Sequence, residues 1–189
     1  SQFEPGSRRR VLKNLLGITS KREMDQLEGR EQVRSLEDVA AFYDKDQRFT
    51  AADVCRIHQV WLGRIYSWAG HYRQVNVKKD EFPFAAAAQI PKLMADFEAG
   101  PLRRHTPCRP TSIDGLAAAL AEVHVELVLI HPFREGNGRA ARILAVLMGL
   151  QAGLPALLFD KLSGRKRRQY FSAVQAGLDR NYDPMTTLF

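Results

Sequence analysis

The feature that most constrains the fold is a pair of apolar helical patterns joined by a short break. Residues 111–130 are rich in Ala, Leu and Val at helical spacing, and a second such pattern runs over 138–153. Pro132 lies between them, and proline disfavours helix in the residue before it. Thr111, with Asp114 three residues later, matches a helix N-cap. The sequence therefore predicts two helices that meet at a loop, with the second beginning at the glycines that follow the break.

Polar and titratable residues cluster in and directly after that break. Residues 131–142 read HPFREGNGRAAR, so a histidine, a carboxylate, two glycines and paired arginines share one short stretch. A helix N-terminus offers unpaired amides and a partial positive charge, and glycines on both sides of Asn137 let the backbone approach an anion. Arg139 and Arg142 lie at the helix end where a cation is disfavoured, which a bound polyanion would explain. The stretch predicts a phosphate site beside a titratable histidine.

The same stretch matches the pattern H-x-F-x-[D/E]-G-N-G-R-x-x-R at every fixed position and resembles the signature of Fic-domain enzymes. Similar segments are VLKNLLGI at 11–18 and RIYSWAGHYRQVNV at 64–77, whose W-A-G-x-x-R part also resembles the family. The resemblance implies an all-α, mainly helical Fic fold with one short β-hairpin flap. It also implies a single Fic domain over 1–189.

The resemblance further implies a role for each motif residue. His131 would be the general base, and Glu135 would hold Mg²⁺. The remaining motif residues would bind the nucleotide: Asn137 the α-phosphate, Gly136 and Gly138 an anion through their amides, and Arg139 and Arg142 the β- and γ-phosphates. Tyr170 and Phe171 either wall an adenine pocket or belong to the core, and the sequence leaves both interpretations open.

Residues 75–85 follow the W-A-G-x-x-R stretch and change in composition towards strand formers and a polar turn. The resemblance implies that they form a flap over the active site, whose exposed strand edge would dock a target protein by backbone hydrogen bonds. The other interpretation is an edge hairpin without a binding role.

Regulation of Fic enzymes often depends on a glutamate in an [S/T]-x-x-x-E-[G/N] helix that pairs with the second motif arginine. The nearest match here ends at Glu28 and has Met24 where Ser or Thr is expected. We therefore expect Glu28 not to inhibit, and the inhibitory helix to lie outside this chain or to come from a small antitoxin partner.

Further helices are predicted over 24–43, 51–62, 91–98 and 167–178, with a loop over 100–110. The chain of 189 residues is 45% hydrophobic and 26% charged, which is ordinary for one globular domain. The net charge of +7 equals the number of basic residues in two clusters, the three arginines at 8–10 in a basic N-terminal arm (1–10) and the four basic residues at 165–168. No nucleic-acid motif accompanies these clusters, so we expect no nucleic-acid partner.

The chain begins without an apolar run, and its apolar stretch at 143–150 is far shorter than a membrane span of ~20 residues. Two cysteines, Cys55 and Cys108, give no disulfide framework. We therefore expect no membrane association and a cytoplasmic protein, or one delivered into another cell's cytoplasm.

The function that the resemblance implies is protein adenylyl transfer: AMP moves from ATP to a Ser, Thr or Tyr hydroxyl of a target protein, with release of pyrophosphate. ATP would be the substrate and Mg²⁺ the cofactor. The alternatives are a Fic-fold transferase of another phosphate-containing group, such as UMP, and a non-catalytic toxin–antitoxin interaction module.

Overall fold

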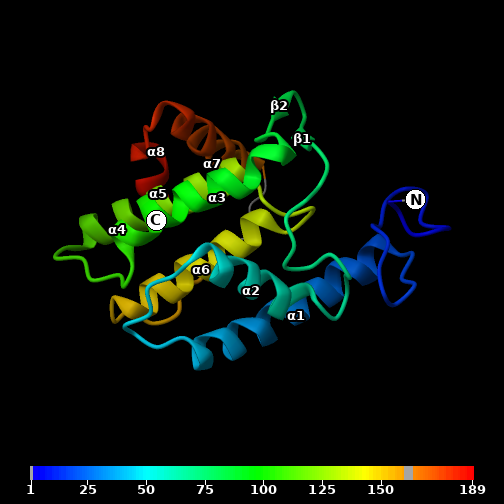
Figure 1. Cartoon of the computed structure of the whole chain (residues 1–189), viewed down its shortest axis with the longest axis horizontal. Coiled ribbons are helices and arrows are strands. Elements are labelled where there is room, and N and C mark those ends of the chain that lie inside the picture. Colours follow the sequence, from blue (N-terminus) through cyan, green and yellow to red (C-terminus); the bar gives the residue numbers. More distant parts are fainter. Residues whose placement is uncertain (1, 160–163) are drawn as a thin grey trace.

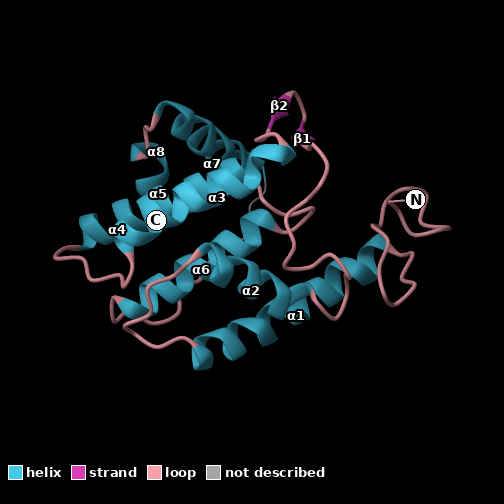
Figure 2. Cartoon of the chain, in the orientation of Figure 1, coloured by secondary structure: helices cyan, strands magenta, loops and turns pink. Residues whose placement is uncertain are grey.

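The computed structural model describes residues 2–159 and 164–189, which form a mainly helical fold with one antiparallel hairpin (Figure 2). This confirms the predicted fold class. The longer helices are α1 (Lys21–Phe42), α2 (Ala51–Leu62), α3 (Ile90–Phe97), α5 (Ile113–Ile130), α6 (Asn137–Gln151) and α7 (Gly164–Ala176). Shorter pieces are η1 (Ala87–Gln89), η2 (Glu98–Leu102), α4 (Arg103–His105), η3 (Gly177–Asp179) and α8 (Asp183–Thr186).

Helix α5 lies at the centre of the molecule and contacts α3, α6, α7 and α8. Figure 1 shows α7 and α8 on one side of α5 and α6 on the other, with α1 and α2 beyond α6. Most residues of α5 and α6 are buried. Both helices are apolar around most of their circumference, and such a helix is stable only when other elements cover it on all sides.

Helices α2 and α5 each begin directly after a side-chain cap. Thr50 caps α2, because its side chain accepts from the Asp53 amide while the Asp53 carboxylate accepts from the Thr50 amide. This reciprocal pair is a capping box, and it confirms the predicted start. The predicted cap of α5 was wrong by one residue: Ser112 rather than Thr111 caps the helix and accepts from the Gly115 amide at 3.0 Å.

The predicted loop over 100–110 is wrong in its first half. After α3 the chain continues through η2, a π-helical turn that contains Pro101, into α4. Leu102 is fully buried, and the Thr106 hydroxyl donates to its carbonyl at 2.7 Å. Burial of that leucine stabilises a turn that the local sequence does not favour.

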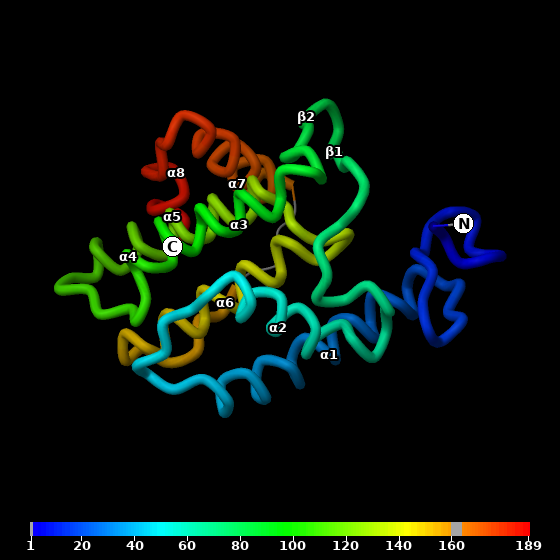
Figure 3. Tube along the Cα trace, viewed as in Figure 1, coloured from blue at the N-terminus to red at the C-terminus, as the bar shows by residue number. Residues whose placement is uncertain are grey.

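The N-terminal arm, described from residue 2, is folded rather than extended and lies beside the start of α1 (Figure 3). The Asn14 side chain donates to the Glu4 carboxylate and to the carbonyls of Leu12 and Ile18. The Leu15 amide donates to the Ile65 carbonyl at 2.8 Å. These bonds dock the arm on the body, and the arginines at 8–10 remain exposed.

The flap is a hairpin of β1 (Lys78–Lys79) and β2 (Phe82–Pro83), shorter than the predicted range of 75–85. Arg73 ties it to the helical body. This buried guanidinium donates to the carbonyls of His131 at 2.7 Å, Val75 at 2.7 Å and Ala85 at 2.6 Å. One side chain therefore joins both ends of the flap to the end of α5.

Replacing Arg73 by Ala should free the flap, because three partly buried carbonyls would lose their donor. We expect the free energy of unfolding to fall by on the order of 3 kcal/mol. Amide hydrogen exchange across residues 75–85 should accelerate as well. The exposed Arg64 offers a control, Arg64→Ala, which should change neither measurement. Unchanged exchange in the Arg73→Ala variant would show that other contacts hold the flap.

Candidate active site

His131 follows directly on α5 in a left-handed conformation, with φ of 53°. A non-glycine residue in this region costs on the order of 1–3 kcal/mol and persists only where surrounding contacts enforce it. Here the His131 amide donates to Leu127 at 3.1 Å and its carbonyl accepts from Arg73. These two bonds hold the backbone of His131 in that conformation.

The His131 ring is held in one tautomer. Nδ1 lies 3.1 Å from the Val128 carbonyl, which can only accept, so Nδ1 carries the proton and Nε2 keeps its lone pair. Phe84 of the flap stacks on the ring, with centroids 3.7 Å apart and an interplanar angle of 16°. Burial lowers the pKa of His131 to about 4, and the positive charges of Arg73 and Lys79 act in the same direction. The ring is a neutral base above that pH.

Gly136 caps α6 with φ of 83°, and no side chain caps this helix. A Cβ on this residue would lie 2.7 Å from Cζ3 of Trp61, so glycine is required both by conformation and by space. The amides in the first turn of α6 have no partner within the helix. The structure thus leaves a free helix N-terminus beside His131, as anion binding needs.

Asn137 braces the loop that precedes this N-terminus. Its side chain is buried, its oxygen accepts from the Phe133 amide at 2.8 Å, and its nitrogen donates to the Phe133 carbonyl at 2.9 Å. One N–H of the amide remains for another acceptor. The predicted contact with an α-phosphate stays a prediction.

His58 of α2 holds the same loop from the other side. Its Nδ1 accepts from the Gly70 amide at 2.9 Å, so Nε2 carries the proton and donates to the Glu135 carbonyl at 3.0 Å. The ring stacks on Phe133 with centroids 3.9 Å apart. Burial lowers the pKa of His58 to about 4, so this neutral residue is a brace between two elements.

Arg139 has partners in the core. Its guanidinium lies 2.7 Å from the Glu28 carboxylate and 4.6 Å from the Trp61 ring centroid. Glu28 is buried on α1 and also accepts from the Tyr66 hydroxyl at 2.7 Å and, through its carbonyl, from the Trp61 indole at 2.9 Å. The nearest match to an inhibitory glutamate therefore pairs with the first motif arginine, not the second.

A cavity of about 490 Å³ opens beside these groups. Every residue assigned a role from the sequence lines it: His131, Glu135, Gly136, Asn137, Gly138, Arg139, Arg142, Tyr170 and Phe171. Arg142 projects from α6, and no carboxylate of the described residues lies within salt-bridge distance of it. The structure brings the predicted set together, while the contacts of each residue with a ligand stay predictions.

Tyr170 and Phe171 of α7 differ in their surroundings. Tyr170 is buried, and its hydroxyl lies 2.8 Å from Nε2 of His124. Phe171 is half-buried, and Lys79 of the flap lies 3.3 Å from its ring centroid. Both rings line the cavity, so each of them can contact a ligand while remaining packed on the protein.

The described residues of the cavity fit a magnesium ion that takes only one of its ligands from the protein. Glu135 is the one acidic residue that lines the cavity among those described, and its side chain is 51% exposed. The described residues contain no group of three His, Cys, Asp or Glu that could hold a metal. Magnesium commonly takes one or two carboxylates together with waters and substrate phosphates, so a single glutamate suits it.

Sequence reasoning missed the roles of Arg73, Phe84 and His58. Arg73 ends the W-A-G-x-x-R stretch, so the signal was present, but nothing in that spacing shows which carbonyls the guanidinium reaches. Phe84 and His58 are single residues distant in sequence from the motif, and only the packing brings their rings to it.

The structure thus combines a helical body, a short flap and a histidine in the loop that precedes a glycine-capped helix. The Fic/DOC family model matches residues 48–148. That match covers more than half of the chain, and the chain belongs to the Fic/DOC family.

Two curated relatives have similar identity to this chain but differ in how much of their own length it covers. Protein adenylyltransferase VbhT of Bartonella schoenbuchensis is 30% identical over 148 residues, which cover 76% of this chain and 30% of that protein. The probable protein adenylyltransferase y4lH of Sinorhizobium fredii is 28% identical over 147 residues, covering 76% and 72%. The chain thus spans less than a third of the length of VbhT and most of y4lH.

Two solved structures share the fold over nearly the whole chain. The Bartonella tribocorum effector BepC, with bound AMPPNP, has a TM-score of 0.74 and 25% identity, covering 94% of this chain and 89% of that one. A Bartonella quintana Fic domain with bound ADP has a TM-score of 0.72 and 28% identity, covering 94% and 88%. Both of these similar proteins bind adenine nucleotides.

Phe84→Ala should raise the pKa of His131 from about 4 towards the ordinary 6.5, because the ring would lose its flap cover and regain water. At about pH 6 a substantial fraction of the variant's imidazole would be protonated, whereas that of the parent would be neutral. NMR titration of the His131 ring signals measures this, with Phe82→Ala as the flap control. Equal pKa values in parent and Phe84→Ala would contradict the role of the stack.

Glu28→Ala should lower the free energy of unfolding by about 1–3 kcal/mol, since the Tyr66 hydroxyl and the Arg139 guanidinium both lose an acceptor. Glu37→Gln changes an exposed carboxylate on the same helix and should leave stability unchanged. Denaturant unfolding compares them. A Glu28→Ala protein as stable as the control would mean that the buried pair contributes no net stability.

Proposed function

We propose that this chain is a protein adenylyltransferase that moves AMP from ATP to a Ser, Thr or Tyr hydroxyl of a target protein. One observation carries the proposal: a neutral His131, with its Nε2 lone pair free, lines the same cavity as an uncapped helix N-terminus. The names of VbhT and y4lH support the reaction, and the AMPPNP and ADP complexes support the nucleotide.

In the proposed reaction the target hydroxyl oxygen attacks the α-phosphorus of ATP. A bond forms between this oxygen and phosphorus, the bond from phosphorus to the β-phosphate oxygen breaks, and pyrophosphate leaves with that electron pair. Nε2 of His131 accepts the hydroxyl proton. A pKa of about 4 makes the imidazole fully available as a base at neutral pH, though a weaker one than an ordinary histidine.

The triphosphate would lie along the start of α6. The amides around Gly138 would bind the α-phosphate, joined by the Gly136 amide once the Glu135 carboxylate, which accepts from it at 3.0 Å, turns to the metal. Arg142 would bind the γ-phosphate because its charge is not paired within the described residues. Glu135 would hold Mg²⁺, which would neutralise charge on the departing pyrophosphate. Arg139 would contact the β-phosphate only with the side of its guanidinium that Glu28 leaves open.

The target protein would dock at the flap, where its backbone could pair with the exposed edge of the β1–β2 hairpin. A small antitoxin, or an inhibitory helix from outside this chain, would place a glutamate on Arg142. The working environment would be a cytoplasm, either the cell's own or that of another cell; the similar BepC protein is a translocated effector. No helix within the described residues is long and apolar enough to cross a membrane.

Intact-mass measurement after incubation with ATP and Mg²⁺ tests the proposal through self-modification. A mass increase of one AMP group supports adenylyl transfer, whereas an increase only with UTP would indicate UMP transfer instead. No increase with any nucleotide, on the chain itself or on added cell proteins, would favour a non-catalytic module. Excess EDTA should abolish the reaction if Glu135 holds the metal.

His131→Ala should slow transfer by roughly 10²–10⁴-fold while leaving ATP affinity nearly intact, because the base acts on the target hydroxyl rather than on the nucleotide. Transfer is followed by mass and ATP binding by calorimetry. His71→Ala is a suitable control, since His71 is exposed and does not line the cavity. Near-normal transfer by His131→Ala would remove this residue from the mechanism.

Glu28→Gln should not raise transfer, because Glu28 pairs with Arg139 and forms no ion pair with Arg142. Loss of the pair should instead lower the rate, as Arg139 becomes less well placed. The mass assay described above measures the rate of transfer by this variant and by the parent. A several-fold rise would identify Glu28 as an internal inhibitor and make the enzyme self-inhibited.

A further inference from the structure

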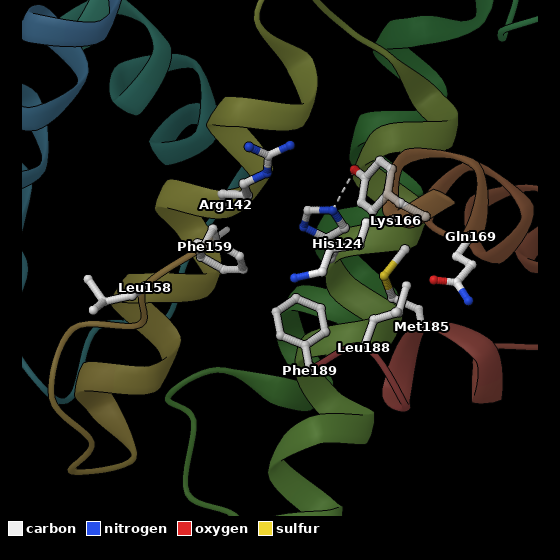
Figure 4. A pocket seen from close by; sticks show the side chains of 10 residues that line it. His124, Arg142, Leu158, Phe159, Lys166, Gln169, Met185, Leu188 and Phe189 are labelled. Atoms are coloured by element: carbon white, nitrogen blue, oxygen red, sulfur yellow. Dashed lines mark hydrogen bonds between the residues drawn. The ribbon is translucent and has the colours of Figure 1, made fainter. Parts of the chain in front are cut away.

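A second cavity adjoins the proposed nucleotide cavity on the far side of Tyr170. It measures about 310 Å³, and its described lining comes from α5, α6, α7, α8 and two neighbouring stretches of chain (Figure 4). Arg142 and Tyr170 line both cavities. The two spaces therefore share one cation and one aromatic wall.

One end of this second cavity is apolar. Met185 is buried there beside Phe189, and the Phe189 ring centroid lies 6.0 Å from that of Phe159, which also lines the cavity. Two leucines on its lining remain open to solvent: Leu158 is 96% exposed and Leu188 is 48% exposed. An apolar hollow of this size with solvent-exposed leucines at its entrance suits the hydrocarbon part of a small ligand.

The other end is cationic. Arg142 has no carboxylate partner among the described residues, and none of the described lining residues has an acidic side chain. Beside it, His124 is buried and bonds through Nε2 to the Tyr170 hydroxyl at 2.8 Å. Burial, together with the charge of Arg142, lowers the pKa of His124 to about 3, so the imidazole is neutral. Gln169 adds an amide to the lining.

We propose that this cavity binds a small amphipathic organic anion, with its hydrocarbon part against Met185 and Phe189 and its carboxylate on Arg142. An arginine fork binds a carboxylate with two parallel hydrogen bonds, which makes the charged end selective. A neutral molecule would lose that contact, and a small polar anion would leave the apolar hollow empty.

The shared arginine couples the two cavities, and this part of the proposal rests on the proposed nucleotide site. An anion that engages Arg142 from the second cavity removes it from the triphosphate. Each ligand should then weaken the other by the same factor, because coupling between two sites is reciprocal. The bound anion would act as an inhibitor that lowers ATP affinity.

The probe is octanoate, compared with octanol, which has the tail without the charge, and acetate, which has the charge without the tail. Titration calorimetry of the 189-residue chain, with no nucleotide present, should show saturable octanoate binding and much weaker binding of the other two. No saturable octanoate binding, or equal binding of octanol, would overturn the proposal.

Leu188→Glu places a carboxylate at the apolar end of the cavity, and should weaken octanoate more than tenfold because the hydrocarbon tail would then lie against a charged group. Leu178→Glu is the matched control, because this leucine is 63% exposed and does not line the cavity. Both substitutions fall on exposed leucines, so both variants should fold. Octanoate affinity unchanged by Leu188→Glu would overturn the assignment to this cavity.

The coupling is measured as ATP affinity with and without saturating octanoate. We expect a weakening on the order of fivefold or more, a much smaller effect on AMP, and none in Arg142→Ala. An unchanged ATP affinity would overturn the coupling. These readouts measure binding alone, so their failure would be distinguishable from failure of the proposed transfer reaction, which the mass assay detects separately.

Discussion

The site depends above all on how the loop between α5 and α6 is braced. Arg73 holds its first residue through the His131 carbonyl, Asn137 closes it on Phe133, and His58 holds it at the Glu135 carbonyl. Each brace is a buried polar group bonded to backbone. Loss of one would leave an unsatisfied carbonyl or amide in the core, so the loop has one conformation rather than several.

The fixed conformation of this loop would position the groups that the proposed reaction needs. The left-handed turn at His131 aims the imidazole at the cavity, and Gly136 brings the start of α6 against Trp61. The His131 ring and the first amides of α6 are therefore fixed relative to each other, which in the proposed reaction would lower the cost of ordering them. The same burial that fixes His131 also keeps it neutral.

Packing gives the two motif arginines different partners. Both were expected from the sequence to bind phosphates, and both line the cavity. Arg139 is restrained by Glu28 and Trp61, whereas Arg142 stands between two cavities without a carboxylate partner in the described structure. Of the two, Arg142 is the one that a nucleotide, an inhibitory glutamate or an organic anion can compete for.

The sequence by itself determined the helical fold, the junction of α5 and α6 and the residues that gather at it, because helical periodicity, capping and a twelve-residue motif are local properties. Only the tertiary structure decided the partners of those residues. Arg73, Phe84 and Glu28 lie 47 to 103 positions before His131, and their contacts depend on how the helices pack. Helical periodicity and short motifs contain no information about contacts over such distances, so the Phe84 stack on His131 and the pairing of Arg139 with Glu28 could be determined only from the fold.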